Sequence, residues 1–118
     1  MPSYVILIYG VEEEFEAMSE QQQAALAAGH RALAAAAGSA IGCTCELDPV
    51  RLATTLRSDG AGGTLIQPGP FLDQDAALAG LYVLDASDDD AARGLAMNLD
   101  ETTAGHSAVE VRRVAGSP

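Results

Sequence analysis

The chain has 118 residues, a length that suits one domain over residues 1–118 with a single hydrophobic core. Its formal net charge is −11, from 17 acidic and 6 basic residues, and every basic residue is arginine. The absence of lysine excludes a Schiff-base lysine and a phosphate-loop lysine. So acidic a chain is not expected to bind nucleic acid, because that requires a basic surface.

Hydrophobic residues make up 48% of the chain, but many are alanine and only 4% of residues are aromatic. An alanine-rich core buries little area per residue, so we expect further burial in a homodimer. No signal-peptide pattern is present, and the longest apolar run, residues 4–9, is far shorter than the ~20 residues of a membrane helix. We therefore expect a soluble cytoplasmic protein that makes no contact with membranes.

The first elements are a strand and a helix. Residues 4–9 (YVILIY) are continuously apolar, which predicts a central strand buried on both faces. The acidic residues 12–16 that follow predict an exposed loop. Ser19 and Gln22 form a capping-box pattern before an alanine-rich helix, and Gly38 predicts its end.

His30 lies on the apolar stripe of this helix, in line with Leu26, Leu33 and Ala37 at steps of three and four residues. Two interpretations follow. One is a core histidine that hydrogen-bonds to the backbone. The other is a partly desolvated general base in a cleft, whose pKa burial and a nearby carboxylate would set close to neutrality.

Residues 41–47 alternate between apolar and polar, which predicts a half-buried strand with Cys43 and Cys45 on its inner face. Two cysteines do not make a disulfide framework. Thiolate metal sites usually use four ligands, and no second cysteine pair exists. We therefore predict two small buried side chains and no metal site.

A hairpin follows, with strands over residues 50–56 and 64–67 and a glycine-rich loop over 58–63. The next residues are Pro68-Gly69-Pro70, which predict a rigid exit from an edge strand because proline cannot donate to a sheet ladder. Phe71 is expected to return to the core.

Residues 81–85 predict the next strand, and Ser87 is expected to cap a second helix that begins with three aspartates. A last strand is predicted over 109–114. Without the inserted hairpin the order is β-α-β-β-α-β, an α+β ferredoxin-like fold with both helices on one sheet face. The other face of the predicted sheet carries no helix, and a dimer in which two such faces pack together would bury it. The buried face of the second helix is expected to consist of Ala92, Leu95, Ala96 and Leu99.

Several segments resemble the YCII-related proteins, and most closely their Asp-Gly-Pro-Phe (DGPF) subgroup: "YVILIYG", "GPF", "GLYVLD" and "SAVEVRRV". The resemblance runs over nearly the whole chain and implies a ferredoxin-like fold that forms a dimeric α+β barrel. Pro68 stands where the subgroup motif has its aspartate. A function that depends on that carboxylate is therefore not expected here.

The resemblance also implies a catalytic pair, with His30 in the histidine position and Asp100 in the aspartate position. Such a carboxylate would fix the imidazole tautomer and raise its basicity for proton abstraction. We expect the 68–71 loop to form one wall of a small-molecule site that needs no cofactor. The predicted ligand-binding residues are Tyr9, Gly69, Phe71 and Tyr82.

Three hypotheses of function remain open. The first is an enzyme, or a vestigial one, that abstracts a proton from a small organic ligand with His30 as base. The second is a non-catalytic dimer that binds a ligand or partner, such as an accessory protein in the sigma-factor-linked transcription regulation that the resemblance suggests. The third is a purely structural family member.

Overall fold

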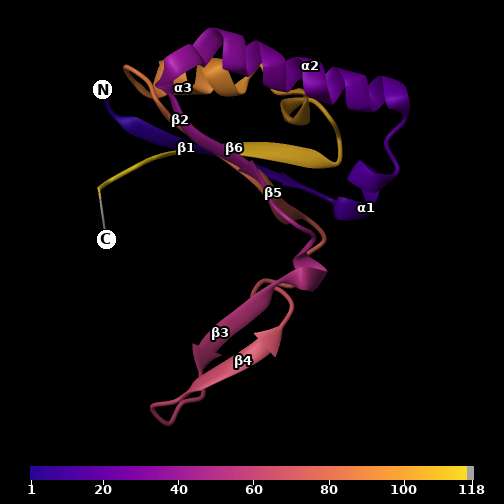
Figure 1. The fold of residues 1–118 in the computed structure, drawn as a ribbon, viewed down its shortest axis with the longest axis vertical. Helices are drawn as coiled ribbons and strands as arrows, with labels where there is room; N and C mark the ends of the chain where they lie inside the picture. Colours follow the sequence, from indigo (N-terminus) through magenta and orange to yellow (C-terminus); the bar gives the residue numbers. More distant parts are fainter. Residues whose placement is uncertain (117–118) are drawn as a thin grey trace.

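In a computed structural model, which describes residues 1–116, the chain forms an α+β fold around a four-stranded antiparallel sheet (Figure 1). Residues 117–118 of the predicted domain lie outside the described residues. The sheet order, β2-β5-β1-β6, is compatible with the predicted ferredoxin-like arrangement. The strands are β1 (Ser3–Gly10), β2 (Ile41–Glu46), β5 (Ala77–Asp85) and β6 (Ser107–Arg113).

Two helices, α2 (Glu20–Ala37) and α3 (Asp89–Ala96), cover one face of this sheet (Figure 1). The predicted capping box is confirmed, because the Ser19 side chain accepts from Gln22 N and the Gln22 side chain accepts from Ser19 N. The predicted cap of the second helix was wrong by one residue: Asp88, not Ser87, accepts from the backbone of the first turn.

The acidic segment after β1 was predicted to be a loop, but it forms the short helix α1 (Glu12–Glu16). Its one large apolar side chain, Phe15, packs over Gly10, where an added Cβ would lie only 2.1 Å from the Phe15 ring. Phe15 also meets the ring of His106 edge-on, with centroids 4.9 Å apart. These contacts hold α1 against the end of the sheet.

The hydrophobic core lies between the sheet and the helices. Alternate residues of β1 point into it, so the strand is fully buried on one face and half-buried on the other. The prediction of burial on both faces is therefore corrected. Buried residues of the core are Tyr4, Ile6, Ile8, Leu33, Tyr82, Leu84, Ala86, Ala92, Ala96 and Leu99.

The opposite sheet face carries no helix among the described residues, and it presents Val5, Leu7, Leu81 and Val83 in adjacent register. Cys43 pairs with Val83 on this face and is exposed, as is Cys45. A register shift between Ile41 and Cys43 puts Ile41 on the helix side instead. The two thiols are thus not buried in the single chain, contrary to the prediction.

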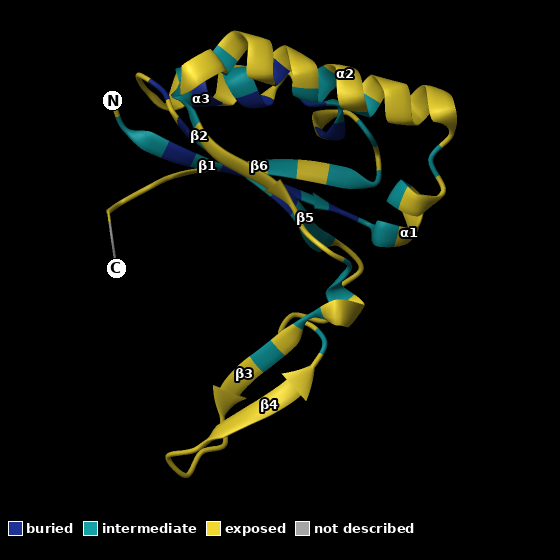
Figure 2. Ribbon diagram, viewed as in Figure 1, coloured by how far each residue is buried: buried dark blue, intermediate teal, exposed yellow. Residues whose placement is uncertain are grey.

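The predicted hairpin is confirmed and projects from the body as an arm, β3 (Thr54–Ser58) paired with β4 (Thr64–Pro68) (Figures 1 and 2). A short 3-10 turn, η2 (Val50–Leu52), leads into it in place of the first part of the predicted strand. The arm closes at its base, because Gly69 N donates to Ala53 O at 2.7 Å and Gly69 O accepts from Thr55 Oγ1 at 2.8 Å.

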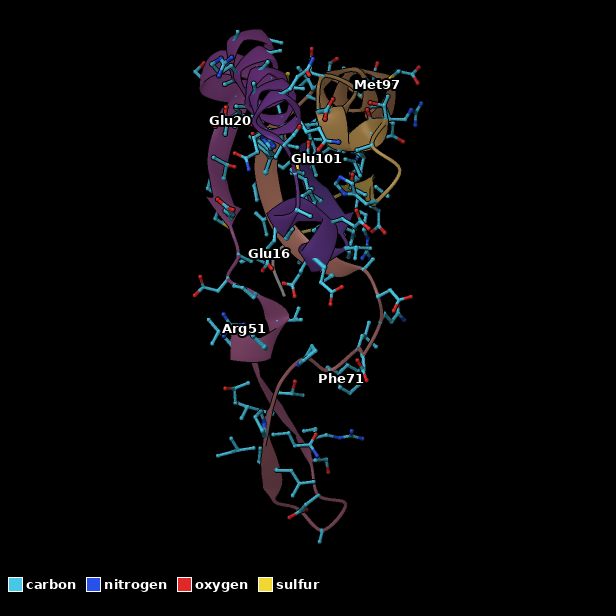
Figure 3. All side chains as sticks on the ribbon, turned by 90° about the vertical axis from the view of Figure 1, so that its right-hand side faces the viewer. Glu16, Glu20, Arg51, Phe71, Met97 and Glu101 are labelled. Atoms are coloured by element: carbon cyan, nitrogen blue, oxygen red, sulfur yellow. The ribbon has the colours of Figure 1, made fainter. Side chains whose placement is uncertain are left out.

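Phe71 does not return to the core. Its side chain is 67% exposed, and its ring faces the guanidinium of Arg57 on the arm, 5.7 Å from Cζ to the centroid. The prediction was wrong because the arm turns away from the sheet, so the segment after it starts far from the core (Figure 3). Among residues 1–116, none of the helices has the length and apolar character that a membrane span requires.

Candidate functional site

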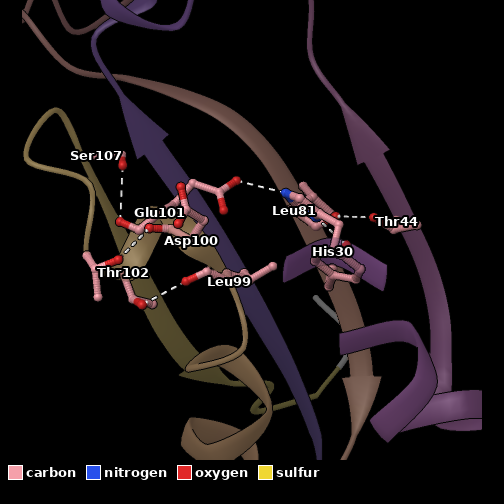
Figure 4. Close-up of polar contacts among 10 residues, drawn as sticks. His30, Thr44, Leu81, Leu99, Asp100, Glu101, Thr102 and Ser107 are labelled. Carbon is pink, nitrogen blue, oxygen red and sulfur yellow. Dashed lines mark hydrogen bonds and ion pairs between the residues drawn. The ribbon is translucent and has the colours of Figure 1, made fainter. Parts of the chain in front are cut away.

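His30 lies in the middle of α2 and uses both ring nitrogens. Its Nδ1 lies 2.5 Å from the hydroxyl of Tyr82 on β5, and its Nε2 lies 2.8 Å from Oε2 of Glu101 (Figure 4). When Nε2–H donates to Glu101 in the neutral imidazole, Nδ1 is left to accept from the Tyr82 O–H. The three side chains therefore form a continuous chain of hydrogen bonds.

Glu101 belongs to the 3-10 turn η3 (Asp100–Thr102), which follows α3. The turn is held by its own side chains: Thr102 Oγ1 donates to Leu99 O at 2.7 Å, and Ser107 Oγ donates to Glu101 O at 3.0 Å (Figure 4). Glu101 is only 2% exposed, and its Oε1 has no hydrogen-bond partner within residues 1–116. Burying a carboxylate raises the free energy of the folded state unless the charge is paired, so the contact with His30 stabilises Glu101 in this position.

Gly29 lets α2 approach η3 closely enough for this contact. An added Cβ at Gly29 would lie 2.8 Å from Asn98 O and 2.9 Å from Asp100 N, both backbone atoms. Such distances leave no room for a side chain. A glycine in a helix interior destabilises the helix by about 1 kcal/mol relative to alanine. Here the absence of a side chain at Gly29 lets the adjacent His30 reach Glu101.

The pKa of His30 is raised above its ordinary value, chiefly by the hydrogen bond to Glu101, against the opposing effect of burial. The charges of Glu101 and Glu46 add to the increase. The pKa of the Tyr82 phenol is also raised, first by burial and then by the charge of Glu101, while Thr44 lowers it. Both groups thus hold their protons more firmly than in water.

A cavity of about 670 Å³ opens beside these residues, and His30, Tyr82 and Glu101 all line it. Its volume falls in the range of small-molecule sites. The walls come from segments far apart in the chain, including α1, α2, β2 and β5. Within the described chain, no cluster of three or more histidine, cysteine or acidic side chains is placed to hold a metal ion.

The structure brings two of the predicted site residues together, His30 and Tyr82. The carboxylate that meets His30 belongs to Glu101 and not to Asp100, its predicted partner, which is the preceding residue. Tyr9, Gly69 and Phe71 do not line the cavity among the described residues. Tyr9 lies opposite Ala108 in the sheet register, and Gly69 and Phe71 belong to the base of the arm.

Sequence reasoning missed Glu101 and Gly29. A lone glycine inside an otherwise alanine-rich helix, one residue before His30, is a sign of close packing that could have drawn attention to Gly29. Glu101 had no such sign beyond its place next to Asp100. The direction of each side chain depends on the 3-10 turn, which the sequence pattern did not predict.

A comparison with family models matches residues 3–115 to the YCII-related domain. No curated protein matches the chain. The match covers all four strands of the sheet, the arm, the helices and the cavity residues. The chain therefore belongs to the YCII-related family.

Proposed function

We propose that this protein is a homodimeric YCII-related protein of the DGPF subgroup that binds a small organic molecule and moves a proton on it. The observation behind the proposal is the hydrogen-bonded series Glu101–His30–Tyr82 along the wall of a 670 Å³ cavity. Each member is placed by a different element, η3, α2 and β5. Buried carboxylate, imidazole and phenol in one series are suited to general acid–base chemistry.

Tyr82 is the group that would exchange the proton with the ligand. Both nitrogens of His30 are occupied, whereas the phenol oxygen can accept a proton as its own passes to His30 Nδ1. The ligand C–H bond breaks and leaves its electron pair on the ligand as an enolate, a new O–H bond forms on Tyr82 as its own proton moves to His30 Nδ1, and the resulting imidazolium is stabilised by Glu101. The reverse transfer returns the proton. His30 is then a positioning and proton-storing residue, and Glu101 holds its tautomer.

The homodimer is proposed from the open sheet face and the arm. The apolar face formed by Val5, Leu7, Leu81 and Val83 faces away from both helices. Two such faces packed together would give the dimeric α+β barrel implied by the family resemblance. Most of the exposed large hydrophobic side chains lie in residues 47–72, the arm and its flanks, and would extend the contact.

The proton-transfer role can be tested by isotope exchange on a neutral ring ketone, 2-tetralone, in deuterium oxide. The wild-type protein is expected to accelerate deuterium uptake at the carbon beside the carbonyl, followed by NMR. The substitution Tyr82→Phe should reduce the acceleration by roughly 100-fold, the usual contribution of one acid–base group.

The matched control is Tyr4→Phe, which also removes one phenolic hydroxyl, but one that bonds to Asp89 away from His30. It should keep the exchange rate. Absence of exchange in the wild type, or equal rates in wild type and Tyr82→Phe, would contradict the proposal. Ligand binding without exchange would favour the non-catalytic accessory role instead.

A further inference from the structure

We infer that the cavity beside His30 selects an organic cation, a ligand with an apolar body and a protonated amine. This inference rests on the proposed function, because it names the ligand class of the same cavity. It comes from the charges and apolar surfaces of the lining residues, which are independent of whether a proton is moved there.

Apart from His30, whose pKa is raised by its contact with Glu101, the charged side chains that line the cavity are carboxylates. Within the described lining no arginine occurs, and the chain has no lysine. The nearest arginines in sequence, Arg31 and Arg51, are exposed and do not line it. Four carboxylates against at most one imidazolium give the lining a net negative charge, which disfavours an anionic ligand. The carboxylates that line the cavity are Glu12, Glu16, Glu46 and Glu101.

Two of these carboxylates already have partners. Glu12 Oε2 accepts from Val50 N at 3.0 Å, and Glu101 contacts His30. Glu16 and Glu46 are exposed at the cavity and take part in no ion pair within residues 1–116. The charge of Glu46 raises the pKa of His30, so its field reaches the inner wall. Glu16 and Glu46 are therefore carboxylates of the lining with which a ligand ammonium group could pair.

Much of the remaining lining is apolar, with Gln23 and Thr44 among its polar members, and this apolar part defines the other half of the ligand. Phe15 supplies an aromatic ring at the wall, and a cation within about 6 Å of a ring face is attracted to it. Glu101 Oε1 is buried without a hydrogen-bond partner among residues 1–116, so His30 compensates the negative charge of this carboxylate only in part. The larger apolar lining residues are Ile8, Phe15, Met18, Leu26, Leu47 and Pro49.

The test is to measure, by calorimetry, the binding of three naphthalene compounds of similar size that differ in charge. They are the cation 1-naphthylmethylammonium, the neutral alcohol 1-naphthalenemethanol and the anion 1-naphthoate. We expect the ammonium to bind tightest and the carboxylate at least tenfold more weakly. The substitutions Glu16→Gln and Glu46→Gln should each weaken ammonium binding roughly fivefold, the effect of one charge about 4 Å away in water. Neither should weaken binding of the neutral alcohol.

The control is Asp75→Asn, which removes one negative charge from an exposed loop residue outside the lining. It should leave ammonium binding unchanged. Equal or tighter binding of the carboxylate would overturn the cation preference while leaving the proposed cavity intact. Failure of all three probes to bind would overturn the inferred ligand class, whereas proton exchange on 2-tetralone decides the proposed function separately.

Discussion

His30 has hydrogen-bond partners at both ring nitrogens. The free energy of unfolding should therefore depend on whether His30 is protonated. Its pKa is raised in the folded state, mainly by Glu101. A group whose pKa rises on folding contributes stability that is complete below its unfolded pKa, about 6.5. That contribution is lost as the pH rises through the folded-state pKa.

The substitution Glu101→Gln should therefore cost the most stability near pH 5.5 and less at pH 9, because a glutamine oxygen can still accept from neutral imidazole. Urea unfolding of wild type and variant at both pH values measures the difference. NMR titration of His30 in the variant should show a lower pKa. A stability difference that stays constant or grows with pH would contradict the assigned ion pair.

Gly29 and Gly94 provide a matched pair, since each is a glycine inside a helix. Gly94→Ala should stabilise the fold by about 0.5–1 kcal/mol, because the position has open space and alanine favours helix. Gly29→Ala should destabilise it by 1 kcal/mol or more, because the methyl group would collide with backbone atoms of Asn98 and Asp100.

Chemical unfolding measures both effects. The Gly29 variant should in addition lower the pKa of His30, because separation of α2 from η3 lengthens the contact with Glu101. Stabilisation by both alanines alike would show that the close approach of α2 to η3 is not required.

At the scale of elements, the arm stands out because its large apolar side chains are mostly exposed. Leu56 and Ile66 lie opposite each other on one of its faces, 66% and 75% exposed. An isolated two-stranded hairpin is only marginally stable in water, so the arm is expected to gain a covering surface. The proposed second copy of the chain supplies one.

Light scattering should therefore show a dimer at micromolar concentration, and Ile66→Ser should shift it toward monomer without lowering the unfolding midpoint of the monomer. The matched control is Met97→Ser, which changes a side chain of equal exposure, 75%, on the opposite part of the molecule. A wild-type monomer, or equal effects of both variants, would contradict the role of the arm.

Local signals predicted the elements of this fold well. The capping box of Ser19 and Gln22 marked the start of α2, and the glycine-rich loop over 58–63 marked the arm. These features depend on residues close together in sequence. The position of His30 on the inward face of α2 also followed from periodicity.

Predictions that depended on distant packing failed. Phe71 was expected in the core because it is large and apolar, but its burial depends on the direction in which the arm leaves the sheet. Asp100 was expected to meet His30, but in a 3-10 turn consecutive side chains diverge by about 120°, so Glu101 points to the helix instead. A shift of one residue therefore exchanged one carboxylate for another.

At the scale of the whole molecule, the chain is a thin body, 49 × 38 × 19 Å, with helices on one side and an open apolar sheet on the other. The cavity is lined from the helix side by residues of α1, α2 and η3, but Cys45 of β2 and Leu47 also line it. Because Cys45 belongs to the edge of the open face, the proposed dimer contact would border one wall of the cavity.

Residues as far apart in sequence as Ile8 and Glu101 meet around the cavity. A molecule bound there would touch segments from both halves of the chain at once, and it would bind the native state only. Mass action then adds RT ln(1 + [L]/Kd) to the free energy of unfolding, about 2.7 kcal/mol at a ligand concentration of 100 Kd. A compound from a metabolite collection that raises the melting temperature of the protein would therefore be a candidate for its natural ligand.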